Sequence, residues 1–144
     1  MNLYLDTSAL IKRYVNETGS RDVRVWLRSA DDKATVLITR AEMSAALNRL
    51  LRMEFLSQED YVKALDEFRS DWWAYHRLPV TEPLVARAEA LACEHNLRGY
   101  DAIHLAAALT WQDLLGLPVT VVTYDKELTE AARALGMEVL PEKQ

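Results

Sequence analysis

The chain has 144 residues, with 17 basic and 22 acidic side chains and a net charge of −5. This length fits one ordinary domain, residues 1–144, that buries enough surface to fold without a metal or a disulfide. The single cysteine excludes an internal disulfide and a cysteine-rich zinc site. The negative charge argues against a broad basic surface for nucleic acid, but it is compatible with an enzyme that neutralises phosphate with metal ions.

No apolar run approaches the roughly 18 residues of a membrane span. The N-terminus has neither the basic nor the apolar region of a secretory signal. We therefore expect a cytoplasmic protein that contacts no membrane. Gly and Pro are scarce, with four of each, which favours a helix-rich chain with few long loops.

The N-terminal half begins with an apolar strand and continues mainly with helical spacings. In chain order we expect a strand at 2–5, helices at 8–15 and 21–30, a strand at 35–38, and helices at 40–55 and 59–75. The strand at 35–38 is predicted from its run of β-branched and apolar residues. In the helix 59–75, Trp72 continues the apolar stripe, so we expect it in the core and its neighbour Trp73 at a protein interface.

The C-terminal half alternates strands and helices. We expect a strand at 77–80, helices at 82–96 and 101–115, a strand at 119–122, a helix at 126–135 capped by Gly136, and a strand at 137–140. Pro79 confines the first of these strands to a sheet edge. The helix 101–115 is apolar almost all round, which predicts that it is buried. Strands that alternate with helices indicate an α/β domain with a mainly parallel sheet.

Four acidic residues occupy related positions in this pattern. Asp6 directly follows the first strand, Glu42 lies in the first turn of the helix after the second, and Asp125 follows the fourth. The carboxyl ends of parallel strands share one edge of a sheet, where ligands bind. The helix 101–115 should run antiparallel to the strand that follows it, which brings Asp101 at its N-terminus to the same edge. We therefore expect the four carboxylates to converge.

Such a cluster predicts a metal site. Carboxylates a few ångströms apart repel one another and raise one another's pKa. A divalent cation relieves the repulsion, and oxygen ligands suit Mg²⁺ or Mn²⁺. The bound ion can orient a phosphodiester, activate water and stabilise the leaving oxygen. From the residues alone we infer a metal-assisted phosphoryl hydrolase.

Each acid also has a simpler interpretation as a helix cap. Asp6, Asp101 and Asp125 all stand where an acid can cap a helix or lie in its first turn. Thr39 and Glu42 match the capping box, in which the glutamate bonds back to the threonine amide. A carboxylate has enough lone pairs to cap a helix and to bind a metal, so both interpretations stay open.

Four short motifs that contain these acids resemble the motifs of PIN-domain nucleases in order and spacing. They read LDTSAL at 5–10, RAEM at 40–43, GYDAIHLA at 99–106 and VTYDKEL at 122–128. The resemblance spans nearly the whole chain, and the compact size is most similar to VapC-type toxins of toxin–antitoxin pairs. It implies a three-layer α/β/α fold and a Mg²⁺- or Mn²⁺-dependent endoribonuclease. It also implies an RNA substrate, a cognate antitoxin that enters the acidic pocket, and a homodimer.

The resemblance further implies roles for individual residues. Asp6 and Asp101 are the expected main metal ligands. Glu42 and Asp125 are expected to complete the ligand set, to hold a second ion or to orient the attacking water. The hydroxyl groups expected to support these acids or to touch the phosphate belong to Thr7, Ser8 and Thr123.

Two cationic side chains close to the motifs, Lys12 and Arg98, are candidate RNA phosphate contacts; the alternative is solvated ion pairing. His104 follows Asp101 by three residues, and we expect a packed, hydrogen-bonded histidine rather than a ligand. Cys93 is expected to be a buried, inert thiol. Tyr124 is expected to narrow the mouth of the acidic pocket.

Other functions are open at this point. A non-catalytic PIN-like binding module should have lost at least one of the four acids, and none is missing. A phosphoacceptor receiver or an aspartyl-phosphatase would also use an acidic pocket in an α/β domain. The phosphatase needs a second aspartate two residues after its nucleophile, and Ser8 stands at that position after Asp6.

Overall fold

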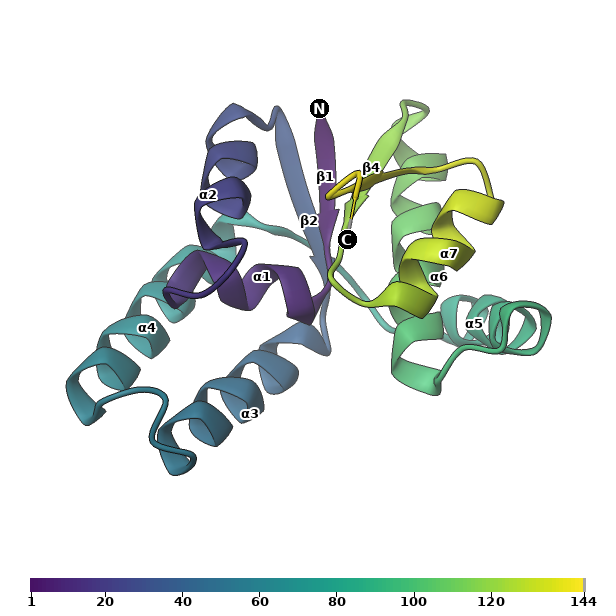
Figure 1. Ribbon diagram of the computed structural model, residues 1–144. Helices are drawn as coiled ribbons and strands as arrows, with labels where there is room; N and C mark the ends of the chain where they lie inside the picture. The colour runs from purple at the N-terminus through teal and green to yellow at the C-terminus, as the bar shows by residue number, and fades with distance from the viewer. Residues whose placement is uncertain (144) are drawn as a thin grey trace.

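The computed structural model describes residues 1–143. It has a parallel sheet between two layers of helices (Figure 1). Across these residues the strands pair in the order β3-β2-β1-β4-β5, each parallel to its neighbour. The bounds are β1 (Asn2–Leu5), β2 (Asp32–Val36), β3 (His76–Leu78), β4 (Val119–Val122) and β5 (Glu138–Leu140). The central strands β1 and β4 begin and end where the sequence predicts them.

Two hydrophobic clusters form the core, one on each face of the sheet, because successive side chains of a strand point to opposite faces. Leu3 and Leu5 pack with the first helical layer, whereas Tyr4 packs with the second. The first layer comprises α1 (Thr7–Tyr14), α2 (Ser20–Ser29), α3 (Thr39–Arg52) and α4 (Gln58–Asp71). The second comprises α5 (Glu82–His95), α6 (Gly99–Leu115) and α7 (Lys126–Ala134). The predicted three-layer α/β/α fold is confirmed.

One boundary difference concerns β2, which begins at Asp32 rather than at residue 35 and ends at Val36 rather than at residue 38. Its register is set by pairing with β1, where Asn2 lies opposite Asp32, so polar residues outside the β-branched run enter the strand. Leu37 and Ile38 then turn the chain into α3, and the backbone of Ile38 is already helical. The apolar pattern located the strand, but the sheet partner fixed its ends.

The second difference lies between α4 and β3. The helix predicted at 59–75 ends at Asp71, and the 3₁₀ turn η1 (Trp72–Ala74) leads into β3. Trp72 is buried and Trp73 is 69% exposed, as their positions on the helix predict. The strand β3 lies at the sheet edge, as Pro79 predicts, but it spans His76–Leu78 rather than 77–80 and ends before the proline.

The second helical layer largely follows the predictions from sequence. α6 is buried along most of its length, and Gly136 ends α7 in a left-handed conformation. The expectation of a buried Cys93 is wrong, since the side chain is exposed. Ala88 and Leu91 form the inner face of α5, and Cys93 points away from it. Within residues 1–143, no helix is long and apolar enough to cross a membrane.

A close approach of the chain to itself occurs at Gly19, between α1 and α2. Its φ angle is +91°, a backbone conformation that is unfavourable for residues other than glycine. A Cβ atom placed there would lie 2.6 Å from the hydroxyl oxygen of Tyr124, in the loop after β4. The absence of a side chain at residue 19 therefore allows Tyr124 to pack across this turn.

We expect Gly19→Ala to lower the free energy of unfolding by more than Gly116→Ala does. Both glycines have positive φ, but the space around Gly116 is open. The control should lose about 1 kcal/mol from backbone strain alone, and Gly19→Ala should lose about 1 kcal/mol more because Tyr124 has to move. Denaturant unfolding of the two variants measures the difference. Equal losses would show that Tyr124 does not depend on the glycine.

Candidate active site

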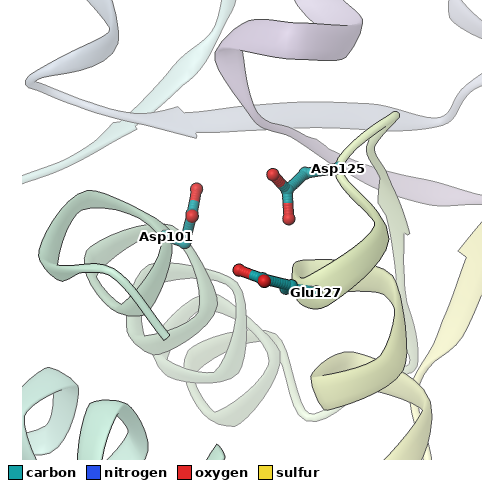
Figure 2. Close-up of side chains that lie close together, drawn as sticks. All are labelled: Asp101, Asp125 and Glu127. Carbon is teal, nitrogen blue, oxygen red and sulfur yellow. The ribbon is translucent and has the colours of Figure 1, made fainter. Parts of the chain in front are cut away.

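The four acidic residues predicted from sequence lie at the carboxyl edge of the sheet. Among the described residues, Asp101 and Asp125 join a close group of carboxylates there, and Asp6 and Glu42 lie outside that group. Asp6 directly follows β1, Asp125 is the N-cap of α7, and Asp101 lies in the first turn of α6. Figure 2 shows Asp101, Asp125 and Glu127 directed toward one another from the ends of two helices. Each of these three residues offers a carboxylate oxygen, and the three oxygens lie within 4.8 Å of one another.

Asp6 is 3% exposed, and its carboxylate is held by three hydrogen bonds. Oδ1 accepts from the Ser8 hydroxyl at 2.8 Å and from the Ala9 amide at 3.0 Å, and Oδ2 accepts from the Thr123 hydroxyl at 2.6 Å. Burial raises the pKa of Asp6, although the charge of His104 and these hydrogen bonds act in the opposite direction. Asp6 is thus a rigid carboxylate that gains from a nearby cation.

The two hydroxyls that hold Asp6 also anchor the loop after β4. The Ser8 oxygen accepts a hydrogen bond from the Tyr124 amide at 2.9 Å, and the Thr123 oxygen accepts one from the Asp125 amide at 3.0 Å. The ends of β1 and β4 are therefore connected through side chains as well as through the sheet. This connection fixes the position of Asp125 relative to Asp6.

Glu42 belongs to a second hydrogen-bonded chain. Its Oε1 accepts from the Thr7 hydroxyl at 2.7 Å and lies 2.8 Å from Nε2 of His104. The other ring nitrogen of His104, Nδ1, lies 2.8 Å from the buried hydroxyl of Tyr4. Burial raises the pKa of that hydroxyl well above its usual value, so the phenol keeps its proton. Nε2 of His104 is the donor to Glu42, because an ionised carboxylate only accepts hydrogen bonds.

This arrangement keeps Glu42 ionised. Burial alone opposes ionisation, but the hydrogen bond and charge of His104 outweigh it, and Thr7 adds to their effect. The pKa of Glu42 is therefore lowered. His104 is 3% exposed and hydrogen-bonded on both sides, as predicted for a packed histidine rather than a ligand.

The capping interpretation holds for two of the four acids. Asp6 accepts from the Ala9 amide in α1, and Asp125 accepts from the Leu128 amide in α7 at 2.8 Å. The predicted capping box does not form, because α3 begins after Ile38 with no side-chain cap and Glu42 is bound to Thr7 and His104. Helix capping therefore does not account for Glu42.

Arg98 connects the remaining acids. Its Nε lies 3.1 Å from Oδ2 of Asp101, and its Nη2 lies 3.1 Å from Oδ2 of Asp125. Burial and the charge of Asp125 raise the pKa of Asp101, whereas Arg98 opposes this shift. The guanidinium is a counterion for two converging carboxylates, as the ion-pairing alternative predicts, and its contact with RNA phosphate stays a prediction.

Lys12 is ion-paired as well, and its contact with RNA stays a prediction. Its ammonium donates to Glu17 at 3.0 Å and to the Thr18 carbonyl at 2.7 Å, and it lies 4.4 Å from the centre of the Tyr124 ring. These contacts hold Lys12 against the turn before α2. The alternative of ion pairing describes it better.

Sequence reasoning missed Glu127. It lies two residues after Asp125 in the fourth motif and in the first turn of α7. A first-turn acid that follows an N-cap acid was the available signal.

The comparisons with known proteins agree with this geometry. A family model described as PIN domain matches residues 3–134. Ribonuclease VapC45 of Mycobacterium tuberculosis is 33% identical over 139 residues, which cover 96% of this chain and 94% of the relative. Among solved structures, FitAcB from Neisseria gonorrhoeae has a TM-score of 0.69 at 22% identity and covers 95% of both chains.

A toxin–antitoxin complex from Klebsiella pneumoniae has a TM-score of 0.61 at 18% identity, over 88% of this chain and 89% of that one. At these identities the solved structures establish the fold alone. The family model and the relative that is 33% identical over 96% of the chain establish the family. The chain belongs to the PIN domain family.

Proposed function

We propose that this protein is a Mg²⁺- or Mn²⁺-dependent endoribonuclease that acts as the toxin of a toxin–antitoxin pair. The proposal depends on one observation, the convergence of Asp101, Asp125 and Glu127 at the edge that also holds Asp6 and Glu42. A relative that is 33% identical over 96% of the chain is named a ribonuclease. Membership of the PIN domain family argues against the phosphoacceptor and phosphatase alternatives.

The donor set fits a hard divalent cation. The oxygens of Asp101, Asp125 and Glu127 lie within 4.8 Å of one another, and carboxylate oxygens are the ligands that such an ion prefers. We assign Asp101 and Asp125 as ligands together with Asp6, and Glu127 as an additional ligand. When bound, the ion supplies a positive charge that polarises the phosphodiester and activates water.

The protein's own groups complete the chemistry. Asp6 is fixed by Ser8 and Thr123, which hold its carboxylate in one orientation at this edge of the sheet. Both hydrogen bonds to Glu42 fall on Oε1, which leaves Oε2 to orient the attacking water as an acceptor. Because the pKa of Glu42 is lowered, this acceptor is ionised at neutral pH.

The proposed partners follow from the same assignment. A toxin of this type acts on RNA in the cytoplasm and requires a cognate antitoxin. The fold relative from Klebsiella pneumoniae is described as a toxin–antitoxin complex, which supports an antitoxin for this chain. The proposal also includes a homodimer of this chain.

Asp101→Asn should reduce RNA cleavage about a hundredfold or more, because it removes charge that holds the cation. Labelled total RNA incubated with antitoxin-free protein and Mg²⁺, Mn²⁺ or a chelator measures the loss. Asp113→Asn is the matched control, since Asp113 lies at the other end of α6 and pairs with Arg87 on the surface. Cleavage without metal, or equal loss in both variants, would contradict the assignment. A metal-loaded chain that binds RNA without cutting it would favour the binding module.

Without metal, the stability of the wild type and that of Asp101→Asn should depend differently on pH. Because the pKa of Asp101 is raised in the folded state, its contribution to stability is present at low pH and is lost as the pH rises through the folded pKa. Asp101→Asn lacks this loss. In a chelator, the unfolding temperature of the variant minus that of the wild type should be larger at pH 7.5 than at pH 4.5. The opposite trend would mean that the charge of Asp101 is well compensated without metal.

Arg98→Ala should tighten the binding of Mn²⁺ about three- to tenfold, because the guanidinium pairs with two carboxylates that bind the ion. Isothermal titration calorimetry measures the affinity without catalysis. Arg87→Ala is the control, since Arg87 pairs with Asp113 away from the cluster. Weaker Mn²⁺ binding in Arg98→Ala would show that Arg98 positions the ligands rather than competing with the ion.

A further inference from the structure

A cavity of about 590 Å³ opens beside the acidic residues, between α5 and α6. Val85, Ala88 and Ala92 of α5 form one wall, and Tyr100 and Ile103 of α6 contribute to the other. Glu42, Asp101 and Arg98 also line the cavity. The cavity is therefore continuous with the site proposed to hold the cation and the scissile phosphate.

The side chains around the cavity suit an apolar, flat ligand. Alanines on α5 leave room, and a Cβ atom at Gly99 would meet no atom within 4 Å. Tyr100 is 67% exposed although it directly precedes Asp101, and Val85 is 42% exposed. Exposed apolar side chains that gather around a cavity commonly mark a ligand-binding site.

The neighbouring groups restrict what this ligand can be. It has to lie beside a phosphate, since Asp101 belongs to the cation cluster as well as to the cavity. Each RNA phosphate has bases attached to the adjacent riboses, and single-stranded RNA is recognised by bases that stack on aromatic rings or on an arginine plane. The volume falls within the range of about 300–1,000 Å³ for small-molecule sites, which accommodates one base with its ribose.

We propose that this cavity receives one unstacked base of the RNA strand, next to the phosphate at the acidic cluster, and that the ring of Tyr100 stacks on that base. The inference rests on the proposed function, because the strand is positioned by that cluster. Tyr100 is then a substrate-binding residue. The experiment below distinguishes this base site from an interface with a second copy of the chain on the same face.

The test measures binding of single-stranded RNA without cleavage. In an Asp125→Asn background with Mn²⁺, a fluorescently labelled adenine octamer and a ribose-phosphate octamer without bases are titrated with protein. Tyr100→Ala should weaken binding of the adenine octamer about five- to hundredfold, the range for loss of one stacked base. It should leave binding of the baseless octamer unchanged, and Tyr100→Phe should bind both like the parent. Trp73→Ala is the control, because Trp73 is 69% exposed but does not line the cavity.

Three results would overturn the inference: equal binding of the adenine octamer with and without the tyrosine ring, an equal loss for the baseless octamer, or a loss in Trp73→Ala of the same size. A halved molecular mass of Tyr100→Ala by light scattering would instead assign the face to a second copy. The proposed nuclease is judged separately, by whether the wild type cuts RNA with metal. A loss specific to the adenine octamer in a chain that never cuts RNA would support the base site and refute the nuclease.

Discussion

Electrostatic repulsion among carboxylates at one edge of the sheet is the constraint around which this end of the molecule is organised. The parallel topology delivers Asp6 and Asp125 to that edge, and α6 adds Asp101. Without compensation such a group disfavours its own ionisation. Burial raises the pKa of Asp6, and burial together with the charge of Asp125 raises the pKa of Asp101. A nearby divalent cation favours the ionised form of both.

Each acid is stabilised by a different kind of neighbour. Asp6 relies on hydroxyls and a helix amide, Glu42 on an imidazole, and Asp101 on a guanidinium. Thr123 beside Asp6 and His104 beside Glu42 are buried, whereas the side chain of Arg98 is 74% exposed. Solvent screens the exposed pair most strongly, so it yields most easily when a doubly charged ion arrives. The site is therefore rigid at Asp6 and exchangeable at Asp101.

Much of this arrangement could be predicted from the sequence, because strand ends in a parallel sheet share an edge whatever the details of packing. The order of elements and the convergence of Asp101 with Asp125 follow from that rule and from helical direction. The partner of Glu42 could not be predicted, since a capping box and a distant histidine are equally compatible with residues 39–42. The roles of Lys12 and Arg98 also depend on side-chain directions, which three-dimensional packing determines. Cys93 shows the same limit, because an apolar neighbourhood in sequence did not place it on the inner face of α5.

The hydrogen-bonded chain from Tyr4 through His104 to Glu42 runs from the middle strand of the sheet to the acidic edge. A buried phenol in the hydrophobic core thus supports the imidazole that donates to the solvent-accessible carboxylate. Loss of that hydroxyl would remove the hydrogen-bond partner of a buried imidazole nitrogen, at a cost of about 1–3 kcal/mol. Residue 4 is consequently not an interchangeable aromatic of the core. Phenylalanine at this position would weaken the support of a carboxylate that the new side chain never touches.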